Sequence, residues 1–369
     1  MTAPSPSPLR IAIVLPPGSL FDADRPNSME TVIRTLVAHR TADEDIRIFC
    51  TAGAKTHGTD LKVEPYDPEN LDDLIKAIKG FDPHLVEFHQ HVIFATKLAH
   101  HLPGVATMVY RHNAMRPPRH RLDRWRYERR YSRIDRFVFV SQSERQIFSR
   151  NFPALADRGV AVLNAIRAED WLAPPGERDR LIVFSGRAMK EKGVAEVCAA
   201  LPAVLEAAPD WRAVLVLNDW DKHKDWAQPH VAPLSAYGDR VKVLHTVPLS
   251  AVQALMKRAD IALTPSLWDE PLGLTALEAH ASGTALISSG RGGLKEASGP
   301  HALYVDPVTP EALATAMLDL IHDPDRRHGL ARDAQAFVIA EHSPQNRAAQ
   351  LSQIRTDLVQ STAGLRGRR

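Results

Sequence analysis

Two glutamates, Glu270 and Glu278, are the residues of this chain best suited to hold a polar ligand. They lie in the segment TPSLWDEPLGLTALEAHASG. This segment predicts the end of a buried strand (261–265), a turn containing proline and glycine, and a helix over 273–282. Glu270 therefore precedes the helix directly, and Glu278 lies one to two turns along it.

The start of this predicted helix has the properties of a phosphate site. The first amides of a helix have no acceptor within it, and the helix dipole makes this end positive. The amides concerned are those of Gly273, Leu274 and Thr275. A phosphate site flanked by two carboxylates that can bind hydroxyl groups is what a nucleotide sugar requires. Taken alone, Glu270 could instead be a capping residue that complements the helix dipole, and Glu278 an exposed helix residue.

A second element of the same kind lies upstream. The predicted strand LIVFS (181–185) is followed by the loop GRAMKEKG and a helix. Gly186 allows the chain to turn at the strand end, and both Arg187 and Lys192 can project towards a ligand. Two cations there would neutralise the charge that accumulates on a departing diphosphate. Basic residues beside a turn are common on surfaces, but two phosphate-type elements after strands of one sheet favour a shared site.

Histidines and aspartates suggest further candidates. The predicted strand VATMVY leads into His112, which could contact a sugar hydroxyl or assist proton transfer. The HQH sequence at 89–91 follows another strand end, but the chain has 17 histidines, so position alone is weak evidence. Asp219 and Asp221 imitate a metal-binding pair, and we interpret them as polar loop residues.

Apolar strands alternate with amphipathic helices along almost the whole chain, which predicts parallel sheets covered by helices on both faces. The polar, proline-bearing stretch 167–180 interrupts this series and is interpreted as a linker. We therefore predict an α/β protein of two doubly wound, Rossmann-like domains, 1–166 and 167–344, facing each other across a cleft. A C-terminal helix within 345–369 is expected to pack back on the first domain. Ser28 is predicted to cap the first helix.

The composition excludes several classes of function. The chain has 369 residues, 44% of them hydrophobic, and a net charge of only +2, which gives no reason to expect a nucleic-acid partner. Cys50 and Cys198 lack metal-ligand spacing and are typical of buried residues in a reducing compartment. No apolar run is long enough to cross a bilayer, and the first residues do not form a signal-peptide pattern. We expect a cytoplasmic protein that needs no metal or other cofactor.

Charge is concentrated in one segment. Residues 111–136 contain ten arginines and three acidic residues, a formal charge of +7. Such a segment can face anionic lipid headgroups or an acidic acceptor, or it can be an ordinary solvated helix surface. We therefore expect a peripheral association with the inner face of the cytoplasmic membrane as one role for it.

The residues described so far match a known family. The chain resembles the retaining glycosyltransferases of family 4, the glycosyl transferases group 1, which have the two-domain GT-B fold. The second half carries the stronger match, in three segments: FSGRAMKEKGVAEV (184–197), the long run from VLHTVPLS to TALISS (243–289), and GRGGLKEAS (290–298). The first half matches more loosely, through PNSMETVIRTLVAH, VEFHQH, MVYRHN, FVFVSQSERQIF and VLNAI.

The resemblance implies a role for each candidate. The counterpart of Glu278 binds the ribose hydroxyls of the nucleotide, and that of Glu270 contacts the transferred sugar. His112 matches a histidine beside the donor sugar and acceptor, so Glu270 and His112 are the expected catalytic residues. Glu296 matches a further acidic position without a defined role. The donor diphosphate would be held by Arg187, Lys192 and the amides around Leu274 and Thr275.

Two positions depart from the family pattern. Where the family commonly has two glycines in the first strand-to-helix loop, this chain has Asn27 and Ser28, ahead of Glu30. Side chains there can narrow the pocket on the acceptor or sugar side. The Asn-Gly often found before the linker is Asn164-Ala165 here.

These observations predict a hexosyltransferase that moves a sugar from a nucleotide-diphosphate donor to an acceptor hydroxyl with retention at the anomeric carbon. The acceptor would be a glycan or a lipid-linked molecule, in cell-surface polysaccharide, lipopolysaccharide or glycolipid biosynthesis. Two alternatives stay open. A nucleotide-sugar epimerase shares the two-domain architecture, and a degenerate, non-catalytic partner subunit could bind a nucleotide sugar without transferring it.

Overall fold

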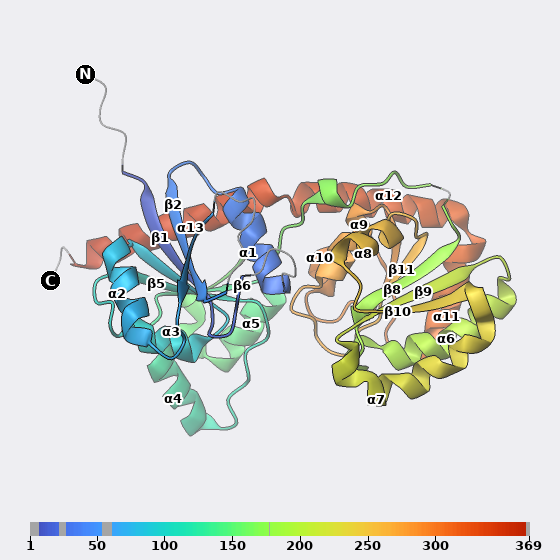
Figure 1. Cartoon of the computed structure of the whole chain (residues 1–369), viewed down its shortest axis with the longest axis horizontal. Coiled ribbons are helices and arrows are strands. Elements are labelled where there is room, and N and C mark those ends of the chain that lie inside the picture. Colours follow the sequence, from blue (N-terminus) through green and yellow to red (C-terminus); the bar gives the residue numbers. More distant parts are fainter. Residues whose placement is uncertain (1–6, 22–26, 54–60, 177, 367–369) are drawn as a thin grey trace, which may run out of the picture. The chain divides into compact units, whose positions relative to one another are not determined.

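The computed structural model describes residues 7–21, 27–53, 61–176 and 178–366 (Figure 1). The chain divides into two compact units. The first consists of Met1–Ala165 together with Pro344–Arg369, and the second of Ile166–Ser343. Each unit contains one sheet whose paired strands all run parallel.

The first unit has a seven-stranded sheet in the order β3-β2-β1-β4-β5-β6-β7. Its strands are β1 (Leu9–Val14), β2 (Glu44–Thr51), β3 (Lys62–Tyr66), β4 (Leu85–His89), β5 (Ala106–Arg111), β6 (Arg136–Phe139) and β7 (Gly159–Ala161). Its helices are α1 (Ser28–Ala38), α2 (Leu71–Phe81), α3 (Val92–Ala99), α4 (Arg121–Tyr131), α5 (Gln142–Asn151) and α13 (Pro344–Arg366).

The second unit has a six-stranded sheet in the order β10-β9-β8-β11-β12-β13. Its strands are β8 (Leu181–Arg187), β9 (Arg212–Asn218), β10 (Val241–His245), β11 (Ile261–Thr264), β12 (Ala285–Ser288) and β13 (Leu303–Tyr304). Its helices are α6 (Val194–Ala207), α7 (Trp220–Val231), α8 (Leu249–Met256), α9 (Leu274–Ala281), α10 (Leu294–Ser298), α11 (Pro310–His322) and α12 (Pro324–Glu341).

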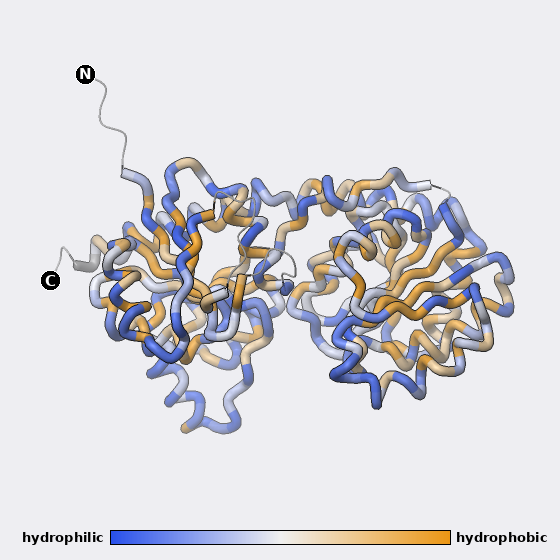
Figure 2. Tube along the Cα trace, in the orientation of Figure 1, coloured by the Kyte–Doolittle hydropathy of each residue, from blue (hydrophilic) through white to orange (hydrophobic). Residues whose placement is uncertain are grey.

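The interior of each unit is built from strand residues. Every residue of β4, β5 and β11 is buried, as expected for central parallel strands covered on both faces. Figure 2 shows the resulting pattern, with hydrophobic strands inside each unit and hydrophilic stretches on its outer helices. Within β4, Glu87 and His89 lie in this apolar setting, and burial of such groups requires hydrogen-bond partners.

The last helix completes the first unit. After α12, the chain leaves the second unit and α13 packs on α1 and β5 (Figure 1). Arg355 of α13 is 3% exposed and forms ion pairs with Glu44 of β2 and Glu87 of β4. In the described range, α13 ends at Arg366, and residues 367–369 lie outside it.

Two local predictions were wrong. The N-cap of α1 is Asn27 and not Ser28, because the Asn27 side chain accepts a hydrogen bond from the Glu30 amide. The stretch 167–180 is not a plain linker either. Its Trp171 is 4% exposed, and Arg178 donates hydrogen bonds to the carbonyl oxygens of Ala259 and Ser282, so the segment packs on the second unit; Glu177 lies outside the described residues.

In the described part of the chain, no helix is both long enough and apolar enough to span a bilayer.

Candidate functional site

The order of the second sheet brings the two predicted phosphate elements together. The chain forms β8, β9 and β10 outwards in one direction, and β11 then returns to the other side of β8. The loops after β8 and β11 consequently leave the same edge of the sheet in opposite directions. Ligands of doubly wound sheets bind at such a switch point, beyond the carboxyl ends of the strands.

An ion pair connects these two loops. The ammonium Nζ of Lys192 lies 2.5 Å from Oε1 of Glu270, and the Ser266 hydroxyl donates to the same carboxylate oxygen at 2.5 Å. Lys192 also lies over the Trp268 ring, with Nζ 5.7 Å from its centroid. Glu270 is 6% exposed. The structure thus joins two predicted ligand-binding residues directly, one from each phosphate element.

Glycines allow the loops to approach closely. Gly193, after Lys192, has φ 74°, and a Cβ there would lie 2.3 Å from the Pro265 carbonyl oxygen. The Leu267 amide donates to the Glu191 carbonyl at 2.8 Å, which ties one loop to the other. A residue with a side chain at position 193 would therefore separate Lys192 from Glu270.

The start of α9 lies close to the start of α10. Gly273 has φ 103°, and an added Cβ would meet Leu294 at 2.5 Å. Within the described residues, the amides of Leu274 and Thr275 donate to no protein acceptor, as predicted for a phosphate site. Arg187, at the end of β8, is exposed and makes no salt bridge with any described residue.

The glycine pair of the GRGGLKE segment packs against the turn that contains Glu270 and Pro271. Added Cβ atoms on Gly292 and Gly293 would lie 2.4 Å from the Glu270 carbonyl oxygen and 2.3 Å from the Pro271 carbonyl oxygen. The Gly293 amide also donates to the Glu270 carbonyl at 2.7 Å. Glu296 follows in the first turn of α10.

The carboxylate of Glu278 has a raised pKa and no hydrogen-bond donor among the described residues. Burial raises its pKa from the ordinary value of 4.5 to about 7. Its side chain is partly buried and accepts no hydrogen bond from any described residue. Hydroxyl donors from a ligand would therefore satisfy a carboxylate that the protein itself leaves unpaired.

We expect Glu278→Gln to raise the free energy of unfolding above pH 7 by about 1–3 kcal/mol. The folded protein binds the Glu278 proton more tightly than the unfolded chain, so wild-type stability falls as pH rises from 4.5 to 7. Glutamine removes that cost. Denaturant unfolding at pH 5 and pH 8 tests the expectation, with the exposed Glu311→Gln as control. An equal effect at both pH values would contradict it.

In the first unit, His112 follows β5 and His89 ends β4, two adjacent strands. The His112 Nε2 lies 2.8 Å from the His89 Nδ1, and the His89 Nε2 lies 3.0 Å from Oε1 of Glu87. The pKa of His112 lies well below its ordinary value because of burial and the nearby His89 and Arg111. His112 is thus a neutral imidazole at neutral pH.

The predicted acceptor-side residues begin α1. Asn27 and Ser28 are exposed, whereas Glu30 is 3% exposed. The Glu30 carboxylate accepts hydrogen bonds from the Phe21 amide at 3.3 Å and the Asn27 side chain at 2.9 Å. These contacts fix the helix start, and a role in acceptor binding stays a prediction.

Several residues of the site escaped sequence reasoning. Ser266 and the glycine pair 292–293 support Glu270; the glycine pair lies in a segment that matches the family, but neither it nor the serine indicates from sequence a contact with Glu270. Glu87 did carry one, because a charged residue inside the apolar strand LVEFH requires a buried partner. The prediction that Asp219 and Asp221 are loop residues was wrong for Asp221, which lies in the first turn of α7; Asp219 precedes that helix and pairs with Lys222 at 3.2 Å.

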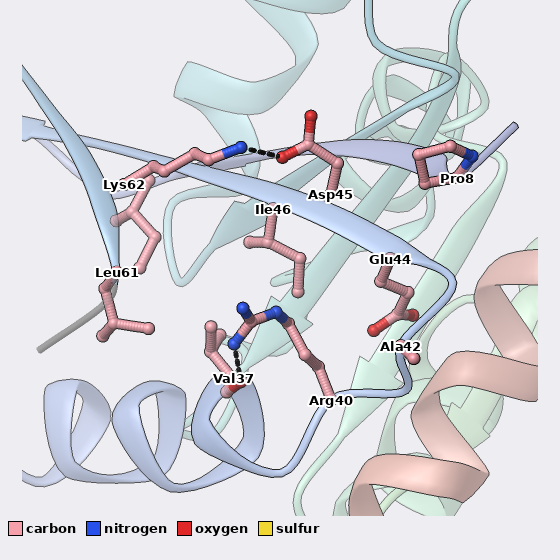
Figure 3. A pocket seen from close by; sticks show the side chains of 10 residues that line it. Pro8, Val37, Arg40, Ala42, Glu44, Asp45, Ile46, Leu61 and Lys62 are labelled. Atoms are coloured by element: carbon pink, nitrogen blue, oxygen red, sulfur yellow. Dashed lines mark hydrogen bonds and ion pairs between the residues drawn. The ribbon is translucent and has the colours of Figure 1, made fainter.

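One hollow in the first unit lies apart from these residues. Figure 3 shows it between the end of α1 and strands β2 and β3. Its volume is about 350 Å³. Lys62 and Asp45 form an ion pair at its rim, at 2.7 Å. It lies near Glu44, where β2 begins, and thus at the edge of the sheet opposite the strand ends that carry His89 and His112.

Among the described residues, no group of three or more His, Cys, Asp or Glu side chains is arranged to hold a metal ion.

Comparison with known proteins identifies the family. The model described as "Glycosyl transferases group 1" matches residues 168–337, and "Glycosyltransferase Family 4" matches residues 29–170. The chain is 32% identical over 190 residues to the D-inositol 3-phosphate glycosyltransferase of Corynebacterium glutamicum, covering 49% of this chain and 44% of that protein. It is 33% identical over 211 residues to the glycogen synthase of Mycobacterium tuberculosis, covering 55% and 49%. The chain thus spans about half the length of these curated relatives.

Solved structures show the same fold over nearly the whole chain. The crystal structure of HepE from Anabaena in complex with UDP has a TM-score of 0.76 at 15% identity, covering 95% of this chain and 100% of that chain. A glycosyltransferase from Rickettsia africae has a TM-score of 0.77 at 16% identity, covering 95% and 99%. At such identities the likeness concerns the fold alone, which is the two-domain GT-B fold predicted from the sequence.

Proposed function

Since the chain belongs to the group 1 glycosyltransferases and has the GT-B fold, we propose that it transfers a sugar from a nucleotide-diphosphate donor to an acceptor hydroxyl with retention at the anomeric carbon. The observation that carries the proposal is the contact of Lys192 with Glu270 at the switch point of the second sheet, beside the unpaired amides that begin α9. A neighbour of the same fold has been solved with UDP-glucose, which is consistent with a donor of this class.

The donor diphosphate would bind between the cations and the helix start. Arg187 has no competing carboxylate among the described residues, and Lys192 has one, Glu270, which it would share with the transferred sugar. As the sugar leaves, negative charge grows on the diphosphate. Lys192, Arg187 and the start of α9 stabilise that charge more in the transition state than in the ground state.

Two carboxylates would orient the sugars. Glu278 would accept hydrogen bonds from the ribose hydroxyls, which replaces the water that its burial has removed. Glu270, held by Ser266 and Lys192, would accept a hydroxyl of the transferred sugar through its remaining lone pairs. On the first unit, His112 would contact the sugar or the acceptor. The cations of Arg187 and Lys192 would neutralise the diphosphate charge, as a metal ion does in other enzymes, so we propose metal-independent transfer.

An assay of nucleotide release tests the proposal. A panel of nucleotide sugars is first screened by thermal shift, because a donor at a hundredfold excess over its Kd stabilises the protein by about 2.7 kcal/mol. We expect stabilisation by at least one donor, and release of its nucleoside diphosphate only when a glycan or lipid-linked acceptor is present. Interconversion of the sugar without acceptor would instead identify an epimerase. Absence of binding to every donor would indicate a non-catalytic subunit.

The Arg-rich segment 111–136 suggests that the protein binds its acceptor at a membrane surface. Within it, α4 exposes two large apolar side chains, Leu122 at 53% and Trp125 at 54%, among its arginines. Arg129 lies 5.6 Å from the Trp125 ring centroid. Tryptophan with surrounding cations suits the interface of an anionic membrane. We propose peripheral binding of α4 at the inner face of the cytoplasmic membrane, with a lipid-linked acceptor of cell-surface glycan, lipopolysaccharide or glycolipid synthesis.

Vesicle co-sedimentation tests this part of the proposal. We expect recovery with vesicles containing anionic lipid, little recovery with neutral vesicles, and loss of binding as salt rises. Trp125→Ala and Arg126→Glu should each reduce recovery severalfold. Ile339→Ala, which removes an apolar side chain that is 45% exposed on the second unit, should leave it unchanged. Equal recovery with both kinds of vesicle would contradict membrane binding by α4.

A further inference from the structure

A chain of hydrogen bonds runs inwards from His112. It passes from the His112 Nε2 to the His89 Nδ1 at 2.8 Å, and from the His89 Nε2 to Oε1 of Glu87 at 3.0 Å. The Tyr110 ring stacks against both imidazoles, with its centroid 4.8 Å from that of His112 and 5.4 Å from that of His89. The stacking and the two hydrogen bonds hold the imidazole planes in one orientation.

The inner end of this chain is a carboxylate that can only accept hydrogen bonds. Oε2 of Glu87 accepts from Arg355 at 2.9 Å (Nε) and 2.8 Å (Nη2), and Nη1 of Arg355 lies 3.2 Å from both oxygens of Glu44. Burial would raise the pKa of Glu87, but Arg355 and His89 outweigh it and lower the pKa to about 2. Glu87 is therefore ionised throughout the neutral range.

The order of donors follows from this end. Glu87 accepts, so His89 donates from Nε2, and with a single ring proton at that atom its Nδ1 is left as an acceptor. His112 must donate its proton from Nε2 to that atom. Its Nδ1 is left as a lone pair, which makes no hydrogen bond within the described part of the chain, on a ring that is only partly buried.

We propose that Glu87 and His89 are positioning residues that hold His112 in the Nε2–H tautomer and so present its Nδ1 as a hydrogen-bond acceptor for a ligand hydroxyl. The tautomer is a property of the first unit alone. Only the identity of the ligand, a sugar or acceptor hydroxyl, rests on the proposed function.

The geometry predicts what Glu87→Gln does. Arg355 can only donate, so the glutamine oxygen must face it, at the position that Oε2 now holds. The amide NH₂ then occupies the Oε1 position and donates to the His89 Nε2. His89 must carry its proton on Nδ1, donate to His112, and convert His112 to the Nδ1–H tautomer. The exchange of one carboxylate oxygen of Glu87 for an NH₂ group would thus change the Nδ1 of His112 from a hydrogen-bond acceptor into a donor.

Glu44→Gln is the matched control. It also removes one carboxylate charge from Arg355, but Glu44 has no contact with either histidine among the described residues. A general loss of stability or of Arg355 ordering would affect both variants alike. A tautomer effect would appear in Glu87→Gln only.

Histidine-labelled protein examined by long-range ¹H–¹⁵N NMR reports the tautomer directly, with His112→Gln and His89→Gln to assign the signals. We expect Nε2–H at His112 in wild type and in Glu44→Gln, and Nδ1–H in Glu87→Gln. A wild-type His112 with its proton on Nδ1, or a doubly protonated His89 at pH 7.5, would overturn the proposal. Identical His112 signals in Glu87→Gln and Glu44→Gln would overturn it as well. If Glu87→Gln fails to fold, the wild-type spectrum alone decides.

Activity gives an independent readout. With a donor and acceptor identified, Glu87→Gln should lower kcat about tenfold or more relative to Glu44→Gln, because its outward nitrogen donates where it should accept. Equal kcat values for the two variants would contradict the assigned role. If no transfer is found with any donor, the proposed function fails, whereas the NMR result still confirms or overturns the tautomer.

Discussion

Replacing Lys192 with alanine should lower turnover at saturating donor by about a hundredfold or more. In the proposed function, Lys192 provides a positive charge beside the donor diphosphate, and removal of one such contact from a partly buried site costs about 2–4 kcal/mol of transition-state stabilisation. The measurement is the rate of acceptor-dependent nucleotide release. Because the charge on the diphosphate grows as the sugar departs, the loss should fall mainly on kcat and less on donor affinity.

Lys190→Ala is the matched control for this experiment. Lys190 lies in the same loop, is exposed, and forms no salt bridge with a described residue. Its removal should change turnover less than threefold. Lys192→Ala also leaves Glu270 buried without its cation, so the double variant Lys192→Ala/Glu270→Gln separates loss of charge from loss of folding. A Lys192→Ala enzyme within threefold of wild type would show that the phosphate site is elsewhere.

Replacing Arg355 with methionine should destabilise the first unit by about 3–5 kcal/mol. Arg355 neutralises the buried carboxylates Glu44 and Glu87, which are 5% and 1% exposed, and no solvent can replace it. Denaturant unfolding measures the loss. Gln353→Met, on the exposed side of the same helix, should cost less than about 0.5 kcal/mol.

The pH dependence of this effect has a definite sign. The pKa of Glu87 lies below its unfolded value because burial is outweighed by Arg355 and by the hydrogen bond from His89. The stabilisation is therefore complete above pH 4.5 and is lost as pH falls towards 2. Arg355→Met should lack this acid dependence. Equal steepness of acid unfolding in wild type and variant would contradict the assigned role of Arg355.

The sequence predicted the architecture well because the strands are short apolar runs separated by amphipathic helices. It also predicts Lys192, Glu270 and Glu278 as ligand-binding residues, since the chemistry of each is visible within a few residues of a strand end. The contact between Lys192 and Glu270 required the strand order, which brings β11 beside β8. No local pattern encodes that order.

Other features depended on long-range partners. Glu87 and Arg355 are 268 residues apart in the sequence, and an arginine on a polar helix gives no sign of burial. The stretch 167–180 has the composition of a linker, but Arg178 binds carbonyl oxygens far along the chain and draws the segment onto the second unit. The cap of α1 was missed by one residue because asparagine and serine are about equally good caps.

The return of α13 to the first unit has a consequence for biosynthesis. Residues up to Ala165 leave the ribosome long before Arg355 is translated, and the second unit is made in between. Until then, the nascent first unit holds Glu44 and Glu87 without their counter-ion. The first unit therefore finishes folding only after α13 has been synthesised, and a ribosome that stalls before α13 leaves an immature first unit for chaperones or proteases to bind.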